Sequence, residues 1–331
     1  MSERSIIDQL DDAVAAIVSG RVVDATTVDP EVARLAEVAR DLRGLPREDF
    51  KAQLGEQLTG RDSMRSEQSR VQEDVSKQPS ATYKREGFHT VTPYLTVEKA
   101  PELVDFVKEA FGATESFRAT GSAGGLHAEV KIGDSMVMIG GGPGIREMPT
   151  AIHLYVPDID DTYQRALVAG ATSLFEPVDQ PYGERAAAVQ DPTGNRWYFA
   201  TTFVPLKEIA DDLHTVTVYF HPIGAPQMIE FLMKAFGAEE VMRSDSEDGY
   251  IYHAKVRIGD SIVEMGEART PSQPMPTAIY LYVEDVDAMY EQALKAGGTS
   301  VLPPADQPYG DRNAWVSDPF GNLWYLSAHI G

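Results

Sequence analysis

The chain carries one long sequence pattern twice, and this duplication constrains its fold more than any other feature. "DQPYGERAAAVQDPTGNRWYF" occupies 179–199, and "DQPYGDRNAWVSDPFGNLWYL" occupies 306–326. Further pairs follow in the same order, among them "FVKEAFGA" with "FLMKAFGA", "HAEVKIGDS" with "HAKVRIGDS", and "MPTAIHLYV" with "MPTAIYLYV". A repeat of about 120 residues is too long for a solenoid unit and long enough for a domain. The 331-residue chain is therefore predicted to hold two modules of one fold, at 87–204 and 212–331.

Within each copy, the hydrophobic pattern predicts strands and helices in a fixed order. "TVTPYLTV" alternates as a strand does, and Leu103, Phe106, Val107 and Ala110 follow at helical spacing before Gly112. "LHAEVKIG" and "SMVMIGG" then alternate on either side of a predicted hairpin turn. From "TAIHLYV" onward the order of strand, helix and strands begins again. The pattern predicts an α+β fold in which each copy contains this order twice.

The residues before the repeats are predicted to form a separate small unit. Three stretches within 1–60 have helical spacing, and 61–86 is polar and reads as a linker. Three short helices cannot bury their apolar stripe by themselves. We therefore expect them to dock on the modules or on a second subunit.

Composition and charge exclude several classes of partner. The formal net charge of −22 at pH 7 repels phosphate backbones, so no nucleic acid is expected. Apolar runs are strand-length, well short of the roughly 20 residues that a membrane helix needs, so no membrane partner is expected. The chain has no cysteine, which excludes disulfides and thiolate metal sites. The first residues lack a basic lead, and a cytoplasmic location is expected.

The nested order and its motifs resemble the vicinal oxygen chelate superfamily of glyoxalases, bleomycin-resistance proteins and extradiol dioxygenases. The matching motifs are the "AFGA" helix end, "HAEVKIGDS", "YVPDIDDTYQRALVAGAT" and "DPTGNRWYF", and within the superfamily they look most like the PhnB-like group. The resemblance covers about 87–202 and 212–330 and implies two tandem glyoxalase-type modules, each of paired βαβββ units. It does not decide whether halves are exchanged between the modules.

The resemblance also implies where metal ligands would lie, on the first and last strands of each βαβββ unit. The positions that match are Thr92, Met138, Ala151 and Tyr198 in the first copy, and Thr217, Glu264, Ala278 and Tyr325 in the second. The first set contains no good ligand and the second contains one, whereas a catalytic metal site usually has three protein ligands. Tyrosines stand where the family often has a terminal Glu. No metal and no cofactor are therefore predicted.

Strand alternation instead predicts two cavities lined by aromatic and hydrogen-bonding side chains. Grouped by repeat, the ligand-binding candidates are Thr92, Tyr94, His153, Tyr155 and Tyr198 for the first cavity, and Thr217, Tyr219, Glu264, Tyr280, Tyr282 and Tyr325 for the second. His127 and His253 are the candidate catalytic or anchoring groups, because histidine titrates near neutral pH. Glu129 is placed to orient His127, and Lys255 occupies the equivalent position in the second copy.

Arg185 and Arg312, which follow "PYG" in both copies, are candidates to hold an anionic ligand group or to be solvated turn residues. The "DPTGN" and "DPFGN" segments are interpreted as structural turns.

Two main functions fit these observations. The first is binding or sequestration of an aromatic or conjugated small molecule, as in bleomycin-resistance proteins, with a neutral or cationic ligand favoured by the acidic chain. The second is an enzyme, either a metal-free acid/base lyase or isomerase that uses His127 or His253, or a metal-dependent glyoxalase or dioxygenase with ligands such as His89 and Glu264. A third, non-catalytic function is regulation through the helical N-terminal region.

Overall fold

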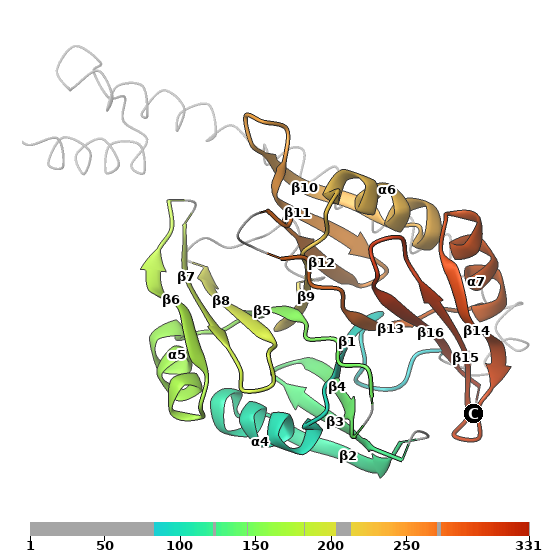
Figure 1. Ribbon diagram of the computed structural model, residues 1–331, viewed down its shortest axis with the longest axis horizontal. Helices are drawn as coiled ribbons and strands as arrows, with labels where there is room; N and C mark the ends of the chain where they lie inside the picture. Colours follow the sequence, from blue (N-terminus) through green and yellow to red (C-terminus); the bar gives the residue numbers. More distant parts are fainter. Residues whose placement is uncertain are drawn as a thin grey trace, which may run out of the picture. The chain divides into compact units, whose positions relative to one another are not determined.

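The computed structural model describes residues 83–121, 124–143, 145–181, 183–202, 213–269 and 273–330. The predicted helical region 1–60 and most of the predicted linker 61–86 lie outside these described residues, and so does any docking of those helices. The described part contains four helices and two eight-stranded mixed sheets (Figure 1). The prediction of an α+β fold with two tandem modules of paired βαβββ units is confirmed.

The elements follow the order that the sequence predicted, twice in each repeat. The first repeat contains β1 (Val91–Thr96), α4 (Ala100–Phe111), β2 (Thr114–Thr120), β3 (Leu126–Ile132), β4 (Ser135–Gly141), β5 (Ala151–Tyr155), α5 (Ile159–Val168), β6 (Thr172–Asp179), β7 (Glu184–Gln190) and β8 (Arg196–Thr202). The second repeat contains β9 (Val216–Phe220), α6 (Ala225–Phe236), β10 (Glu239–Asp245), β11 (Ile251–Ile258), β12 (Ser261–Met265), β13 (Ala278–Tyr282), α7 (Val286–Lys295), β14 (Thr299–Asp306), β15 (Asp311–Ser317) and β16 (Leu323–His329).

Local sequence sets the ends of the four helices. A proline stands in the first turn of α4 and of α6, and Gly112 and Gly237 end these helices in the left-handed conformation that glycine adopts without strain. Asp158 and Asp285 cap α5 and α7, each accepting a hydrogen bond from a main-chain N–H in the first turn. None of the helices in this part of the chain is long and apolar enough to cross a membrane.

Each sheet is built from halves of both repeats. Sheet A has the strand order β14-β15-β16-β13-β1-β4-β3-β2, and sheet B has the order β10-β11-β12-β9-β5-β8-β7-β6. The repeats are joined where β1 pairs antiparallel with β13 and where β5 pairs antiparallel with β9. The question that the sequence left open is thereby answered, since the halves are exchanged. The boundaries at 87–204 and 212–331 describe repeats along the chain, and each sheet extends across them.

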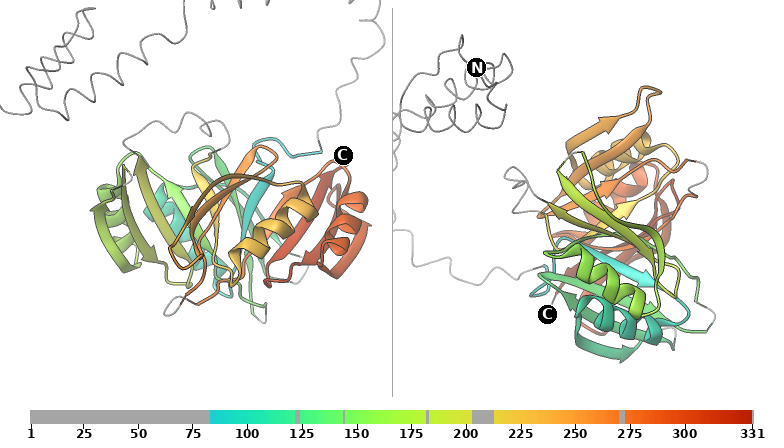
Figure 2. Two further views of the ribbon diagram at one scale, coloured as in Figure 1. Left: turned by 90° about the horizontal axis from the view of Figure 1, so that it is seen from above. Right: turned by 90° about the vertical axis from the view of Figure 1, so that its left-hand side faces the viewer.

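The two hydrophobic cores beneath the helices, in contrast, follow the repeats. One core joins α4 and α5 to strands of the first repeat from both sheets, and the other joins α6 and α7 to strands of the second repeat. Figures 1 and 2 show α4 beside α5 and α6 beside α7, with the strands between the two helix pairs. A repeat is thus a packing unit, while a sheet is shared between repeats.

The repeated Trp-Tyr ending divides its two side chains between the faces of a sheet. Trp197 is fully buried in the first core, and its Nε1 donates a hydrogen bond to Asp191 at 2.9 Å. Asp191 also accepts from the main-chain N–H groups of Thr193 and Asn195, so the "DPTGN" segment is a turn that anchors the tryptophan. Tyr198, the next residue, points to the opposite face because side chains alternate along a strand.

The repeated "GDS" turn fastens each repeat to the start of the other. Asp134 Oδ1 accepts from the N–H of Thr215 at 2.8 Å, and Ser135 Oγ accepts from the N–H of Val216 at 3.0 Å. The equivalent bonds run from Thr90 to Asp260 at 2.7 Å and from Val91 to Ser261 at 3.1 Å. These reciprocal bonds satisfy main-chain donors at the beginning of β1 and β9, where the exchanged halves meet.

Candidate functional site

Each sheet has one face covered by helices and one face turned away from them, which we call the inner face. Because each sheet combines one half of each repeat, the predicted site residues group differently on these faces than the sequence suggested. On sheet B the inner face combines residues from both repeats, namely His153, Tyr155, Tyr198, Thr217, Tyr219, His253, Lys255 and Glu264. On sheet A it combines Thr92, Tyr94, His127, Glu129, Met138, Tyr280, Tyr282 and Tyr325. The prediction that each repeat lines its own cavity is therefore wrong, because the last strands of each repeat join the other sheet.

A fully buried carboxylate is the centre of the inner face of sheet B. Glu264 lies on β12 with no exposed surface and contacts His153 Nδ1. Tyr155 donates its hydroxyl to Glu264 at 2.7 Å, and Lys255 Nζ lies 3.1 Å from the same oxygen. Lys255 also donates to the Tyr155 hydroxyl at 3.0 Å. The carboxylate is thus held by groups from β5 of the first repeat and β11 of the second.

In this cluster the pKa shifts keep the Glu264 carboxylate charged and the His253 imidazole neutral. Burial opposes ionisation of Glu264, but its neighbours His153, Lys255 and His253 overcome this effect and hold its pKa below its usual value. Burial lowers the pKa of His253, although the nearby Glu264 opposes the shift. His253 Nε2 lies 3.8 Å from Glu264, and 27% of its side chain is exposed. Near neutral pH the face therefore presents an accessible neutral imidazole in front of an ionised carboxylate.

Aromatic rings extend this face beyond the charged cluster. The ring of Tyr219 lies 5.4 Å from that of Tyr198 and 5.9 Å from that of His253, all partly exposed. The Tyr198 hydroxyl lies 3.1 Å from His221 Nε2, and burial lowers the pKa of His221 to about 4. His221 follows β9 and was not among the predicted site residues. The partly exposed rings thus lie beside the charged cluster on the same face.

Apolar side chains on the edge strands border the same face. Phe175 on β6 pairs with Ala188, which pairs with Tyr198, and Met242 on β10 pairs with Lys255. Cross-strand partners point to the same side of a sheet, so both apolar side chains belong to the inner face. Each is 39% exposed, although an isolated apolar side chain gains by burial. The inner face of sheet B therefore combines a polar centre with apolar side chains at its border.

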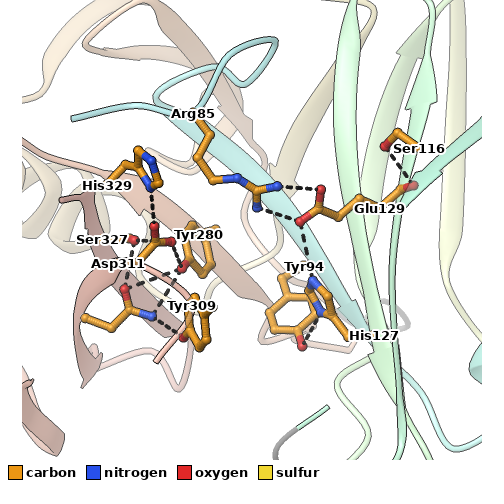
Figure 3. Close-up of polar contacts among 11 residues, drawn as sticks. Arg85, Tyr94, Ser116, His127, Glu129, Tyr280, Tyr309, Asp311, Ser327 and His329 are labelled. Atoms are coloured by element: carbon orange, nitrogen blue, oxygen red, sulfur yellow. Dashed lines mark hydrogen bonds and ion pairs between the residues drawn. The ribbon is translucent and has the colours of Figure 1, made fainter. Parts of the chain in front are cut away.

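The inner face of sheet A also holds a buried carboxylate, but a different one (Figure 3). Arg85 binds Glu129 through two hydrogen bonds of 2.6 and 2.9 Å, and Glu129 is 3% exposed. His127 Nε2 lies 3.5 Å from Glu129, and His127 Nδ1 lies 3.3 Å from the Tyr94 hydroxyl. The structure therefore brings the predicted His127 and Glu129 together. Burial opposes ionisation of Glu129, but its bonds from His127 and Arg85 lower its pKa on balance.

A second buried carboxylate, Asp311, lies across the same face (Figure 3). It contacts His329 Nδ1 at 2.8 Å, and it accepts hydroxyl bonds from Tyr280 at 3.2 Å and Ser327 at 3.3 Å. Burial raises the pKa of Tyr280, so this phenol stays protonated. Asp311, His329 and Ser327 were not among the predicted site residues, and no motif in the sequence pointed to them.

The chain's own residues cover the tyrosines of β13 and β16 on the inner face of sheet A. Tyr83 and Phe88 pack with the tyrosines of this face, and the rings of Phe88 and Tyr282 are 5.7 Å apart. Equivalent positions on the two sheets therefore differ in exposure. On sheet A, Tyr280, Tyr282 and Tyr325 are buried. On sheet B, their counterparts His153, Tyr155 and Tyr198 are partly exposed. Sheet B therefore presents the more accessible of the two inner faces.

Four predicted candidates have contacts that differ from the expected ones. The hydroxyls of Thr92 and Thr217 bond main-chain oxygens three residues earlier, at 3.2 and 3.3 Å, and both side chains are buried. Arg185 binds Asp160 and Asp179, and Arg312 binds Asp287 and Asp306. Because Asp160 and Asp287 belong to helices α5 and α7, these arginines lie on the helix-covered side and not with the other candidates.

The residues present do not fit the metal site that the fold suggests. Because the halves are exchanged, the ligand positions of each sheet come from both repeats. They are Thr92, Met138, Ala278 and Tyr325 on sheet A, and Thr217, Glu264, Ala151 and Tyr198 on sheet B. The first set has no good ligand, and the only carboxylate of the second already binds His153, Tyr155 and Lys255. Metal sites with protein ligands usually need three donors, so we assign no reaction step to a metal on these faces.

Comparisons with known proteins agree with this geometry. The family model described as Glyoxalase/Bleomycin resistance protein/Dioxygenase superfamily matches residues 87–199 and 224–326. Uncharacterized proteins of Mycobacterium bovis and Mycobacterium tuberculosis are each 41% identical to the chain over 117 residues; the match spans 32% of this chain and 77% and 69% of those proteins. The crystal structure of glyoxalase I from Zea mays is similar with a TM-score of 0.56 and 17% identity, over 72% of this chain and 92% of that chain. At this identity the likeness shows the fold alone.

Proposed function

Because the chain belongs to the glyoxalase/bleomycin resistance protein/dioxygenase superfamily, we propose that the inner face of sheet B binds a small aromatic or conjugated molecule without a metal ion. Binding without turnover would sequester such a compound. The observation that carries the proposal is the position of His253. This half-buried imidazole stands 3.8 Å from the fully buried Glu264, among partly exposed aromatic rings.

The side chains around His253 define what the ligand should look like. Tyr198 and Tyr219 offer ring faces for stacking, and Phe175 and Met242 offer apolar contacts at the edges of the sheet. Neutral His253 can donate or accept one hydrogen bond, which would fix the orientation of a polar group on the ligand. The net charge of −22 favours a neutral or cationic compound over an anion.

The repeats supply a matched control for this proposal. We expect His253→Ala on sheet B to weaken binding of an aromatic ligand about tenfold, because alanine cannot make the hydrogen bond of the imidazole. The equivalent variant His127→Ala on sheet A, where Arg85 already occupies the carboxylate beside the histidine, should bind as the wild type does. Calorimetric titration of ligands found in a thermal-shift screen of aromatic compounds measures both. Equal effects of the two variants, or no binding by any planar compound, would contradict the proposal.

A metal-free base catalyst is the second candidate, and the His253–Glu264 pair favours it. A neutral imidazole with its pKa lowered by burial can accept a proton near neutral pH, and the ionised carboxylate stabilises the imidazolium that forms. We expect a bound ligand with an acidic C–H to exchange it for deuterium in D₂O with wild-type protein and not with His253→Gln. NMR of the ligand at saturating protein measures this exchange. Binding without exchange by the wild type would leave sequestration as the function.

A further inference from the structure

A cluster of titratable side chains lies away from both inner faces, where the two repeats begin. His89 precedes β1 and His214 precedes β9 at the equivalent position, and their rings stack with centroids 3.4 Å apart and planes 10° apart. His89 Nε2 lies 3.2 Å from the main-chain oxygen of Asp134, and His214 Nε2 lies 2.7 Å from that of Asp260. Each histidine thus contacts the main chain of a "GDS" turn, His89 that of the first repeat and His214 that of the second.

The two aspartates are equivalent in sequence but not in their charge partners. Asp260 forms an ion pair with Lys84, whose ammonium group lies at its Oδ2. Asp134 has no lysine or arginine partner among the described residues, and its Oδ2 faces His214 Nδ1 at 3.7 Å. The second repeat carries Ile209 at the position that matches Lys84. One half of the cluster therefore holds a cation supplied by the chain, and the other half holds an exposed carboxylate beside two imidazoles.

We propose that a divalent zinc-like cation binds at His89, Asp134 and His214. One ligand atom from each residue lies within 4.8 Å of the others, while tetrahedral zinc at 2.0–2.1 Å from its ligands places them about 3.3 Å apart. Imidazole and carboxylate are ligands that Zn²⁺ accepts. The Asp134 side chain is 54% exposed, so an ion can enter from solvent and keep a water as its fourth ligand.

The hydrogen bonds of His214 prepare it for this role. When its Nε2–H donates to the Asp260 carbonyl, Nδ1 carries the lone pair, and this atom is the one that faces Asp134. His89 contributes its Nε2, which contacts the main-chain oxygen of Asp134 and exchanges this contact for the ion. The lone pairs of stacked rings run parallel, so the two rings tilt apart when they bind one ion. The ion then connects the first repeat to the second.

The equivalent aspartates allow a matched test on the full, untagged chain after treatment with a chelator. We expect the wild type to bind one Zn²⁺ in calorimetric titration and to melt at a higher temperature with Zn²⁺. Asp134→Asn and His214→Gln should lose both effects, although the asparagine oxygen can still accept the Thr215 bond. Asp260→Asn and His253→Gln should keep both effects.

Three outcomes would overturn the proposal. They are the absence of stoichiometric Zn²⁺ binding by the wild type, undiminished binding by Asp134→Asn, and equal losses in Asp134→Asn and Asp260→Asn. Circular dichroism and melting without metal show that the variants are folded before they are compared. Because the proposed ligand site on sheet B uses different residues, either proposal can fail without affecting the other.

Discussion

Replacing Glu264 by leucine is expected to lower the free energy of unfolding by about 3–5 kcal/mol, the range measured when one partner of a buried ion pair is removed. Lys255 is 5% exposed and would keep its ammonium group inside the protein without a counter-charge. The Tyr155 hydroxyl and His153 would also lose the oxygens that they contact. Urea unfolding followed by tryptophan fluorescence measures the loss.

The double variant Glu264→Leu, Lys255→Met separates the charge from the packing. Exchanging both members of a buried ion pair for apolar side chains is often nearly neutral, so the double variant should recover part of the stability that the single variant loses. A single variant within about 1 kcal/mol of the wild type, a typical value for an exposed pair, would show that Glu264 is not the centre of the cluster.

Acidification from pH 7.5 to pH 5 is expected to cost about 2 kcal/mol of stability through His221 alone. Burial lowers the pKa of this imidazole to about 4 in the folded chain, against about 6.5 when unfolded. Between these values the unfolded state binds the proton and the folded state does not, so stability falls as the pH falls. His253 and His89 also have pKa values lowered first by burial, and they add to the loss in the same direction.

The variant His221→Gln isolates this effect, because glutamine does not titrate. Unfolding free energies of the variant should change with pH less steeply than those of the wild type between pH 6.5 and pH 4.5. Below pH 4.5, protonation of carboxylates with lowered pKa, such as Glu264, destabilises both proteins. An identical slope for both proteins above pH 4.5 would contradict the assignment to His221.

The order of strands and helices could be predicted from the sequence because it depends on local patterns. Period-two alternation and helical spacing are visible within ten residues, and the glycines at 112 and 237 mark helix ends directly. Which strands pair across the sheet is a long-range choice. β5 reads "AIHLY" and β13 reads "AIYLY", so β1 meets nearly the same partner in either repeat, and no local signal distinguishes the exchanged arrangement from the direct one.

The residues of the candidate site could be predicted from local patterns, but their grouping could not, because it depends on which strands pair. Alternation identified the inward-pointing residues correctly, including His253, Glu264 and Tyr198, but it grouped them by repeat. Arg85 was missed because it lies in a polar segment without periodicity, which read as a linker. Its partner Glu129 is 44 residues away, and only the folded chain brings the two together.

The exchange of halves has a consequence for how such a protein can change by mutation. Two separate copies of one repeat would form two sheets with identical inner faces, so every substitution would appear on both. In a single chain with two repeats, each inner face is encoded by its own codons. The two faces do differ, since β3 and β4 carry Glu129 and Met138 where β11 and β12 carry Lys255 and Glu264. A chain that holds both repeats can therefore change the residues of one inner face without changing those of the other. Because both repeats contribute to both faces, neither repeat can be lost without removing half of each.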